Sequence, residues 1–387
     1  MALRGGLRVR DLLLVGTPGD RRVVMFAGAW ARGGGPEPRV VAWRDVLGGG
    51  PVPVPEGGLV RVDSPGEDAA TDAMLRGPGE PSRVGGGARW YRGFMAGLEA
   101  VRDAVARTPG ARLLGDAGEI GVMFDKRVCH ARLEAAGVPV PPALPGPPVT
   151  GYGELRERLG AAGWGRVFVK PAHGSSASGV IALQVNGDRV RAVTSAALDR
   201  PSPPGGPAAY NSLKVRVYGD HADVGTLVEL LAPDGLHVER WFPKAGIGGR
   251  VFDLRVVVVA GTPTHAVVRA SRTPMTNLHL GGVRGDLAAV RARLGEDGWA
   301  RALDVCARAA ACFPGSLAVG VDLMVGANWR DLAVAEVNAF GDLLPGLTGL
   351  DGSGAEGLDT YGAQVAAITA GRYGGAPVRP AAAGTGG

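Results

Sequence analysis

The chain has 387 residues, a formal net charge of +5 at pH 7 and only 5% aromatic residues. Its length predicts two or three domains, and scattered arginines with few aromatic side chains argue against nucleic-acid binding. Three cysteines without a Cys-x-x-Cys pair, and no apolar run of about 18 residues, argue against a disulfide framework and a membrane-spanning helix. We therefore expect a soluble, cytoplasmic protein that contacts neither nucleic acid nor membrane.

The first part of the chain predicts a domain of alternating strands and helices. Short apolar runs at residues 11–16, 40–43 and 59–62 are separated by segments of helical length, which is typical of buried strands in a parallel sheet. Turns follow the first run at residues 16–19 and the third at residues 63–66. Such turns lie where parallel sheets hold ligands, although the second turn is also compatible with an ordinary connection.

A helix is predicted over residues 119–137, with an apolar stripe formed by Val122, Val128, Leu133 and Ala136. The prolines that follow predict an extended segment over residues 138–142. Further strands, a Pro/Gly-rich surface loop and a long helix are then expected. In chain order, these segments cover residues 167–169, 180–183, 201–207, 251–259, 288–311, 317–325 and 332–340.

Lysine is rare in this sequence, since only four of the 42 basic side chains are lysines. A lysine that persists among so many arginines indicates a place that needs a compact ammonium group. Lys170 ends a predicted strand and is followed by His173-Gly-Ser-Ser-Ala-Ser-Gly179. A small, hydroxyl-rich loop behind a lysine is suited to nucleotide phosphates, and a solvated strand-end lysine is the alternative.

Three polar residues fall together on the last two predicted strands. A turn centred on Trp329 places Asp322 opposite Glu336, and Asn338 shares a strand face with Glu336. Two carboxylates side by side on a buried face require a compensating cation. Oxygen ligands of this kind suit Mg²⁺, whereas a solvated face with incidental acids is the alternative.

Taken in chain order, the sequence motifs of this protein resemble those of the ATP-grasp superfamily. The resemblance covers residues 116–372 and extends more loosely over residues 1–115. It is carried by Phe124-Asp-Lys126, Val169-Lys170-Pro171, His237-Val-Glu-Arg-Trp-Phe242, Phe252-Asp-Leu-Arg255, Arg269, Asn277-Leu-His-Leu-Gly-Gly282, Asp322 and Glu336-Val-Asn338. Residues 277–282 look most like the branch of ribosomal-protein glutamate ligases. That branch often has an arginine two positions before the asparagine, where this chain has Met275, and Arg272 is a candidate replacement.

The resemblance implies a mixed α/β fold. An N-terminal α/β domain of the pre-ATP-grasp kind is expected over residues 1–115. A two-lobed ATP-grasp module with antiparallel sheets follows, with a central lobe over residues 116–238 and a C-terminal lobe over residues 239–372. Residues 373–387 are Gly/Ala/Pro-rich and are expected to form a disordered tail.

The resemblance also implies residue roles. It implies ATP binding through phosphate-contacting lysines, a closing loop, an adenine-reading hinge and a residue near the ribose: Lys126, Lys170, Ser175, Ser176, Glu239, Arg240, Trp241 and Asp253. It implies that Arg269 and Asn277 act with Lys170 on the transferred phosphate. It implies that Asp322, Glu336 and Asn338 bind Mg²⁺, with Mn²⁺ as an alternative ion.

The implied activity is ATP-dependent ligation of a carboxylate to an amine through an acyl phosphate. The substrates would be small-molecule or peptide acids and amines, with the acceptor pocket lined by the first domain around residues 16–19, 63–66 and 89–92. A homo-oligomer is compatible with the sequence. Two alternatives are a small-molecule kinase and a nucleotide-binding partner protein without turnover. The resemblance assigns no role to Lys214 or Lys244, and both stay unexplained at this point.

Overall fold

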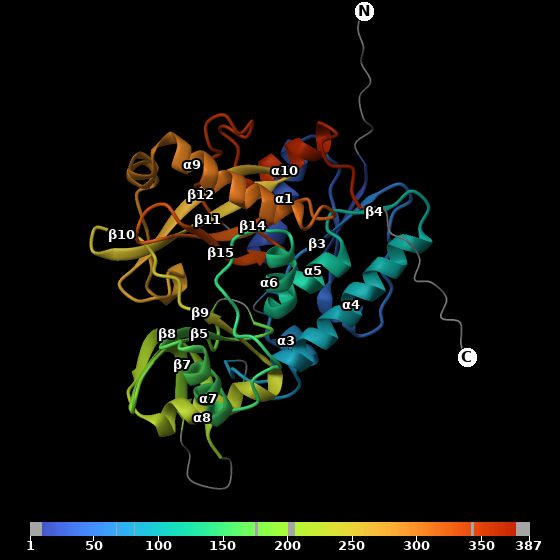
Figure 1. Cartoon of the computed structure of the whole chain (residues 1–387). Coiled ribbons are helices and arrows are strands. Elements are labelled where there is room, and N and C mark those ends of the chain that lie inside the picture. The colour runs from blue at the N-terminus through green and yellow to red at the C-terminus, as the bar shows by residue number, and fades with distance from the viewer. Residues whose placement is uncertain are drawn as a thin grey trace, which may run out of the picture.

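The computed structural model describes residues 10–66, 68–80, 82–174, 177–199, 206–341 and 344–376. Three sheets organise the chain, one in the N-terminal part and one in each of two lobes that lie above one another in Figure 1. Among the described helices, none has the length and apolar character needed to cross a bilayer.

The N-terminal sheet is fully parallel, as the sequence predicts, with strand order β2-β1-β3-β4. Its strands are β1 (Leu12–Gly16), β2 (Arg39–Ala42), β3 (Leu59–Val62) and β4 (Arg112–Leu113), and its helices are α1 (Arg21–Arg32), α2 (Trp43–Leu47), α3 (Ala69–Arg76) and α4 (Gly87–Arg107). In β1, Leu12 and Leu14 face the core around α1, while Leu13 and Val15 face the core around α4. Burial on both faces explains the continuous apolar run. Strand β2 is less buried than expected, since it lies at the sheet edge and Val40 is 41% exposed.

The central lobe contains a five-stranded antiparallel sheet with strand order β8-β7-β6-β5-β9. Its strands are β5 (Arg166–Pro171), β6 (Ile181–Asn186), β7 (Arg189–Asp199), β8 (Ala208–Tyr218) and β9 (Leu236–Arg240), and helices α7 (Tyr152–Ala162) and α8 (His221–Leu231) pack on it. In α8, Val224, Leu227, Val228 and Leu231 are buried. Their spacing forms one apolar stripe, so the helix can cover the sheet.

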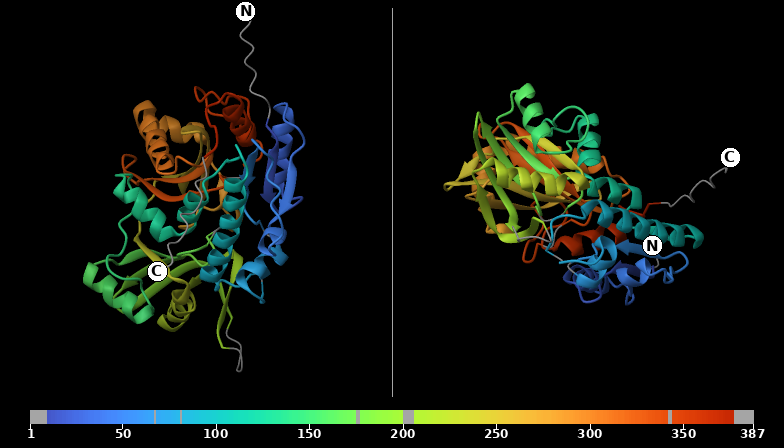
Figure 2. Two further views of the ribbon diagram at one scale, coloured as in Figure 1. Left: turned by 90° about the vertical axis from the view of Figure 1, so that its right-hand side faces the viewer. Right: turned by 90° about the horizontal axis from the view of Figure 1, so that it is seen from below.

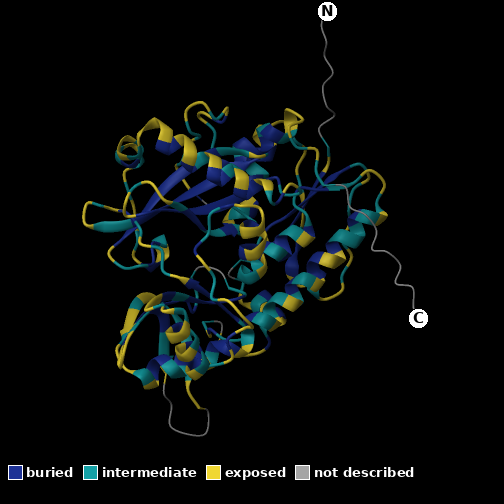
Figure 3. Cartoon of the chain, in the orientation of Figure 1, coloured by how far each residue is buried: buried dark blue, intermediate teal, exposed yellow. Residues whose placement is uncertain are grey.

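The third sheet has six strands, with β13-β12-β11-β14-β15 in order and β10 paired to β11. Its strands are β10 (Gly246–Ile247), β11 (Arg250–Val259), β12 (Thr262–Ser271), β13 (Val283–Arg284), β14 (Ala318–Val325) and β15 (Leu332–Asn338). Helix α9 (Leu287–Ala311) packs on one face, and α1 and α10 (Thr360–Thr369) pack on part of the other. Figure 3 shows that the long strands of this sheet are mostly buried.

The predicted helix over residues 119–137 is wrong in one respect, because it is broken in two. The structure has α5 (Ala117–Phe124) and α6 (Lys126–Ala135). Between them Asp125 leaves the helical region, and its carboxylate accepts the backbone N–H of Arg127 at 3.0 Å, which caps α6. The break changes which side chains face inward. Val128 of the expected stripe is 47% exposed, whereas Cys129 and Leu133 are buried.

Two of the predicted domain boundaries differ from the packing that the structure shows. The sequence-based division places residues 117–138 in the central lobe, yet Met123, Leu133 and Val138 join the core of the six-stranded sheet. At the C-terminus, the predicted disordered tail starts at residue 373, but residues 373–376 are still held by hydrogen bonds. The Tyr373 hydroxyl donates to Gly315 O at 2.5 Å, and Ala376 N–H donates to Leu113 O at 2.8 Å. Residues 377–387 lie outside the described residues.

The N-terminal part is tied to both lobes (Figure 2). On the central lobe, the Asp234 carboxylate accepts the backbone N–H groups of Gly86, Gly87 and Ala88 at 2.5, 3.0 and 3.2 Å, which caps α4. On the C-terminal side, the Phe26 ring of α1 meets the Tyr361 ring of α10 edge-on at 6.0 Å. The three sheets are therefore linked by specific contacts.

Arg61 of β3 strengthens the link to α10. Its guanidinium donates to both Asp63 carboxylate oxygens at 3.0 Å and to Gln364 Oε1 at 2.7 Å, and it lies 4.0 Å from the centre of the Phe26 ring. Arg61 and Asp63 are both buried. Removing one partner of such a pair leaves an uncompensated charge in the interior.

We expect Asp63→Ala to lower the free energy of unfolding by about 3–5 kcal/mol, because it strands the Arg61 charge. The matched control is Asp45→Ala, which removes a carboxylate 3.8 Å from Arg44 in a pair whose side chains are more than 60% exposed. That control should cost less than about 1 kcal/mol. Denaturant unfolding measures both, and equal losses in the two variants would contradict the assignment.

Candidate active site

A cavity lies between the five-stranded and six-stranded sheets. It encloses about 660 Å³ of space between side chains, part of it open to solvent. Its charged lining alternates in sign, with four cationic and four acidic side chains: Lys126, Lys170, Lys244, Arg269, Glu239, Asp253, Asp322 and Glu336. So many ionisable groups in one partly closed cavity indicate a functional site.

Two lysines reach the cavity from different elements. Lys126 begins α6, and its Nζ donates to Glu336 Oε1 at 2.8 Å and to Gly174 O at 2.6 Å. Lys170 lies near the end of β5, and its Nζ is 2.5 Å from Glu239 Oε1 on the neighbouring β9. These two of the four lysines therefore line the same cavity.

These lysines also hold the carboxylates in their charged form. Burial would raise the pKa of Glu239, but the Lys170 ammonium and the His237 ring together outweigh this effect and lower the pKa to about 2. For Glu336, burial is again opposed, chiefly by Lys126, and the pKa falls below its ordinary value. Both side chains are therefore anions at neutral pH.

Cross-strand pairing builds the rest of the charged face. Arg269 on β12 stands opposite Asp253 on β11, and its Nε donates to Asp253 Oδ1 at 2.8 Å. Arg255, two residues further along β11, stands opposite Asp322 on β14, with Nη1 3.0 Å from Oδ1. Arg269 Nη2 also lies 3.0 Å from Asp322 Oδ2. Acids and bases therefore alternate across three neighbouring strands.

The predicted pairing of Asp322 with Glu336 is confirmed, although a β-bulge between Asp322 and Leu323 shifts the pairs nearer the turn by one residue, so that Leu323 pairs with Val334. Asp322 pairs with Glu336 across β14 and β15, and Trp329 adopts a positive φ of 59° in the turn. Asn338 lies opposite Gly320, and its Nδ2 donates to Gly320 O at 3.4 Å, which leaves the amide oxygen free of that bond.

The donor chemistry of this hairpin fits Mg²⁺. Burial raises the pKa of Asp322 even though Arg255 and Arg269 oppose it, and its buried Oδ1 has no aligned hydrogen bond among the described residues. An additional cation would therefore stabilise it. The donors would be the carboxylates of Asp322 and Glu336 and the amide oxygen of Asn338. In the described ranges, this hairpin included, no group of three or more His, Cys, Asp or Glu side chains is placed to hold a metal, so the donor set proposed here consists of two carboxylates and one amide.

Two solved structures resemble this one over nearly the whole chain. The first is the crystal structure of D-cycloserine synthetase DcsG, with a TM-score of 0.55, 18% identity, and coverage of 94% of this chain and 100% of that chain. The second is the ATP-grasp ligase PsnB complexed with a minimal precursor, with a TM-score of 0.50, 17% identity, and coverage of 94% and 100%. No family model matches the sequence, and no curated protein does.

The chain has the ATP-grasp fold. The expected fold class is thus confirmed, with a parallel N-terminal sheet and two antiparallel sheets. At this level of identity the likeness concerns the fold, and it does not extend to a particular branch of ATP-grasp proteins.

The structure separates the residues expected at the ATP-grasp hinge. Glu239 is 3% exposed and lines the cavity through its contact with Lys170. Arg240 is exposed, and Trp241 packs 5.0 Å from the Phe168 ring, outside the cavity lining. Ser175 and Ser176 of the expected closing loop lie outside the described residues, although Gly174 before them lines the cavity.

Asp253, which is expected near the ribose or phosphates, is held by three neighbouring side chains. Besides Arg269, it accepts a short hydrogen bond from the Thr276 hydroxyl and lies 3.8 Å from Lys244 Nζ. Burial would raise the pKa of Asp253, but Arg269 and Lys244 lower it. In the structure, the Asp253 carboxylate positions the side chains of Arg269 and Lys244.

Lys244 is the site residue that sequence reasoning missed. Its side chain is 9% exposed, lines the cavity and donates to the Thr276 hydroxyl at 3.3 Å. Burial lowers the pKa of this lysine, with partial compensation by Asp253. The rarity of lysine was a signal for it, but no motif placed it beside the other lysines.

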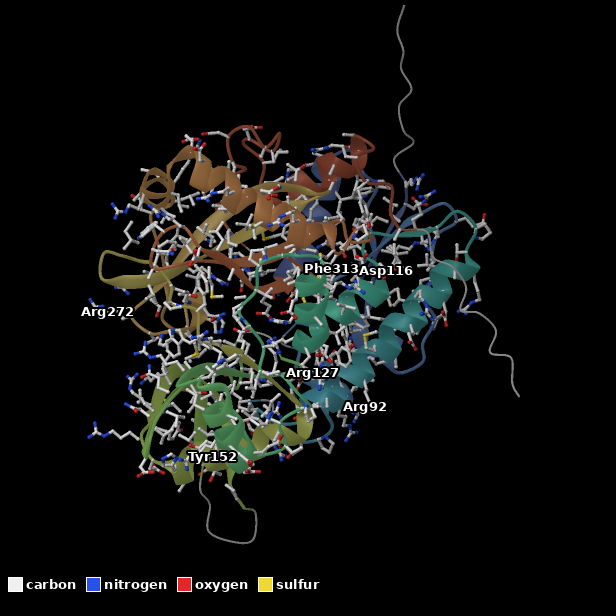
Figure 4. All side chains as sticks on the ribbon, viewed as in Figure 1. Arg92, Asp116, Arg127, Tyr152, Arg272 and Phe313 are labelled. Atoms are coloured by element: carbon white, nitrogen blue, oxygen red, sulfur yellow. The ribbon has the colours of Figure 1, made fainter. Side chains whose placement is uncertain are left out.

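The candidate replacement for the missing arginine is not in the cavity. Met275 is buried in a small core with Val180 and Leu280. Arg272 is exposed, and Figure 4 shows it at the outer edge of the six-stranded lobe, whereas Arg127 lies near the start of α6 where the lobes meet. Asn277, in contrast, lines the cavity as expected.

The Glu239–Lys170 contact predicts a pH dependence of stability. Because the pKa in the folded state lies below its ordinary value of 4.5, the ionised carboxylate stabilises the fold above pH 4.5 and loses this effect as the pH falls toward 2. Between pH 5 and pH 3 the loss should be about 2 kcal/mol. Glu239→Gln should lack this part of the slope in denaturant unfolding, and parallel wild-type and variant slopes would contradict it.

Proposed function

We propose that this chain is an ATP- and Mg²⁺-dependent ligase that joins a carboxylate to an amine and releases ADP and phosphate. The observation that carries the proposal is the meeting of Lys126 and Lys170 with Asp322 and Glu336 in one cavity between the two antiparallel sheets. Cations from both sides and a pair of acids suit a nucleotide triphosphate and its metal ion. The ATP-grasp fold supports the same assignment.

In this proposal, different residues bind the phosphates, the adenine and the ribose of ATP. Lys126 and Lys170 exchange their carboxylate partners for phosphate oxygens. Lys244, on the same wall as Arg269, adds a further positive charge. The backbone of the segment from Glu239 to Trp241 reads the adenine, Asp253 lies toward the ribose or phosphates, and the loop that contains Ser175 and Ser176 closes over the phosphates.

The metal would be held by Asp322, Glu336 and Asn338. When bound, Mg²⁺, or Mn²⁺ in its place, neutralises charge on the terminal phosphates. Lys126, which lies 2.8 Å from Glu336, then becomes available to the nucleotide. In the proposed complex, the Lys126 ammonium would be neutralised by ATP phosphates, and the Glu336 carboxylate would be neutralised by the metal ion.

The reaction follows from these positions. A carboxylate oxygen of the acid attacks the γ-phosphorus, the bond to the bridging oxygen breaks, and ADP leaves. The amine then attacks the carbonyl carbon of the acyl phosphate, the carbon–oxygen bond breaks, and phosphate leaves as the nitrogen loses a proton. Arg269, a buried and permanently charged guanidinium, stabilises the moving phosphoryl group together with Asn277 and Lys170. Exclusion of water protects the acyl phosphate.

Within the ATP-grasp proteins, the motif at residues 277–282 favours kinship with the ribosomal-protein glutamate ligases. Asn277 lies in the cavity in agreement with this kinship. Met275 occupies the position of an arginine in that branch and is buried among apolar side chains. We therefore propose the shared chemistry of that branch and not its substrates.

Lysine itself should be required at position 170. Lys170→Arg should lower ATP-dependent phosphate release by about 10²-fold or more, because a planar guanidinium cannot replace the ammonium wedged between Glu239 and Ala335 O. The control Lys214→Arg changes an exposed lysine of β8 and should behave like the wild type. The assay supplies ATP, Mg²⁺ and panels of amino acids, short peptides and amines. Wild-type rates in Lys170→Arg would contradict the proposed site.

The products decide between ligation and phosphate transfer. A ligase releases free phosphate only when both an acid and an amine are present, and it forms a new amide that mass spectrometry detects. Phosphate transferred to a stable acceptor would identify a kinase. ATP binding without turnover under any combination would identify a nucleotide-binding partner protein. Either result would overturn the ligase proposal.

A further inference from the structure

A second cavity adjoins the nucleotide cavity. It encloses about 1540 Å³, part of it open to solvent, and receives side chains from the N-terminal sheet and from both lobes. Four residues line both cavities: Gly174, Arg269, Asn277 and Glu336. A molecule in the second cavity would therefore have one end at the place proposed for the transferred phosphoryl group.

The far end of this cavity is formed by the carboxyl edge of the parallel sheet. Arg22 lies in the first turn of α1, which follows β1, and Ser64 lies just after β3. Strands β1 and β3 are neighbours, so these two side chains come to the same edge. The Thr17 hydroxyl donates to Pro65 O at 2.6 Å and joins the two loops. In contrast, Asp63 is buried in its contact with Arg61, and residues 89–92 line neither cavity.

Arg22 differs from the other arginines of this cavity. Arg255 and Arg269 stand within 3.0 Å of Asp322. Arg22 forms no ion pair with any described residue, and its buried Nε has no hydrogen-bond partner there. A buried donor without a partner is unfavourable, and it is satisfied when a ligand supplies an acceptor. Arg22 therefore offers a charge that the protein itself does not compensate.

Ser64 adds a neutral donor at the same end. Its Oγ accepts the backbone N–H of Gly66 at 3.2 Å, which orients the side chain and leaves its own O–H to donate. A guanidinium and a hydroxyl together match the two oxygens of a carboxylate. The same cavity is also lined by the apolar side chains of Phe340 and Leu344, which suit a short hydrocarbon chain.

We propose that Arg22 and Ser64 bind a second, non-reacting carboxylate carried by one of the two ligation substrates. The inference rests on the proposed ligase function and narrows its substrate class. At least one substrate is a small molecule with an extra carboxylate, such as a dicarboxylic acid or an amino acid. Its reacting group lies at the end shared with the nucleotide cavity, and its fixed carboxylate lies at the carboxyl edge of the N-terminal sheet.

Binding without ATP tests this directly. The probes are glutarate and L-glutamate, with butyrate and 4-aminobutyrate as matched compounds that lack the second carboxylate. Calorimetry should show tighter binding of the dicarboxylates by wild type and a loss of about tenfold to a hundredfold in Arg22→Gln. The matched control is Arg21→Gln, because Arg21 is the exposed neighbour on the same helical turn. A wild type that does not distinguish the paired probes, or an Arg22→Gln variant that binds as wild type does, would overturn the proposal.

Turnover then shows which substrate carries the extra carboxylate. In Arg22→Gln, the KM of that substrate alone should rise about tenfold or more, with the smaller part of the effect in kcat. A raised KM for the acid assigns the group to the acid, and a raised KM for the amine assigns it to the amine. Unchanged KM values for both would overturn the proposal.

The ligase proposal fails separately. An ATP-induced rise in wild-type Tm that Lys170→Arg abolishes tests the nucleotide site, and no residue of the Arg22 end takes part in it. If ATP does not bind but the dicarboxylates do, the ligase function is wrong and the carboxylate site stands. If ATP turns over but the wild type binds the dicarboxylates and their matched compounds equally, the ligase function stands and the carboxylate site is wrong.

Discussion

The site depends on buried charges that neutralise one another across neighbouring strands. Taking a lone carboxylate or guanidinium out of water costs several kcal/mol, and a close partner of opposite sign offsets much of this. Asp253 and Arg269 face each other across β11 and β12, and Asp322 meets Arg255 across β11 and β14. Because each charge needs its neighbour, the sheet can hold these groups on the wall of a cavity without unfolding.

Such compensation also explains how the cavity can receive a charged ligand. Lys126 and Lys170 stand against Glu336 and Glu239 in the structure, so their ammonium groups are already positioned where anions would bind. The proposed nucleotide and metal ion would bring both signs of charge and would take the place of these internal partners. The cost of binding is thereby reduced, since few groups must be desolvated without compensation.

Strand alternation decides where these charges lie. Along β11, Phe252, Leu254, Val256 and Val258 face the core beneath α9. The intervening positions carry Asp253 and Arg255 near the cavity, and then Val257 and Val259, which pack against α1 and α10. Strand β11 thus supplies charged side chains to the cavity near its start, and near its end it supplies apolar side chains that pack against α1 and α10. This arrangement brings the carboxyl edge of the parallel sheet close to the charged wall.

The sequence by itself determined the features that depend on local spacing. The parallel strands follow from short apolar runs. The pairing of Asp322 with Glu336 was counted from the hairpin turn, because register in adjacent antiparallel strands is counted along a short stretch, but the β-bulge between Asp322 and Leu323 that this pairing includes is not visible in the sequence. The sequence did not show the helix break at Asp125, since a side chain that caps the next turn leaves the apolar pattern almost unchanged. Only the tertiary structure decided that Lys244 joins the other lysines and that Arg22 faces the same cavity as Glu336. Those residues are distant in the chain, and their meeting depends on how three sheets pack together, which no local periodicity encodes.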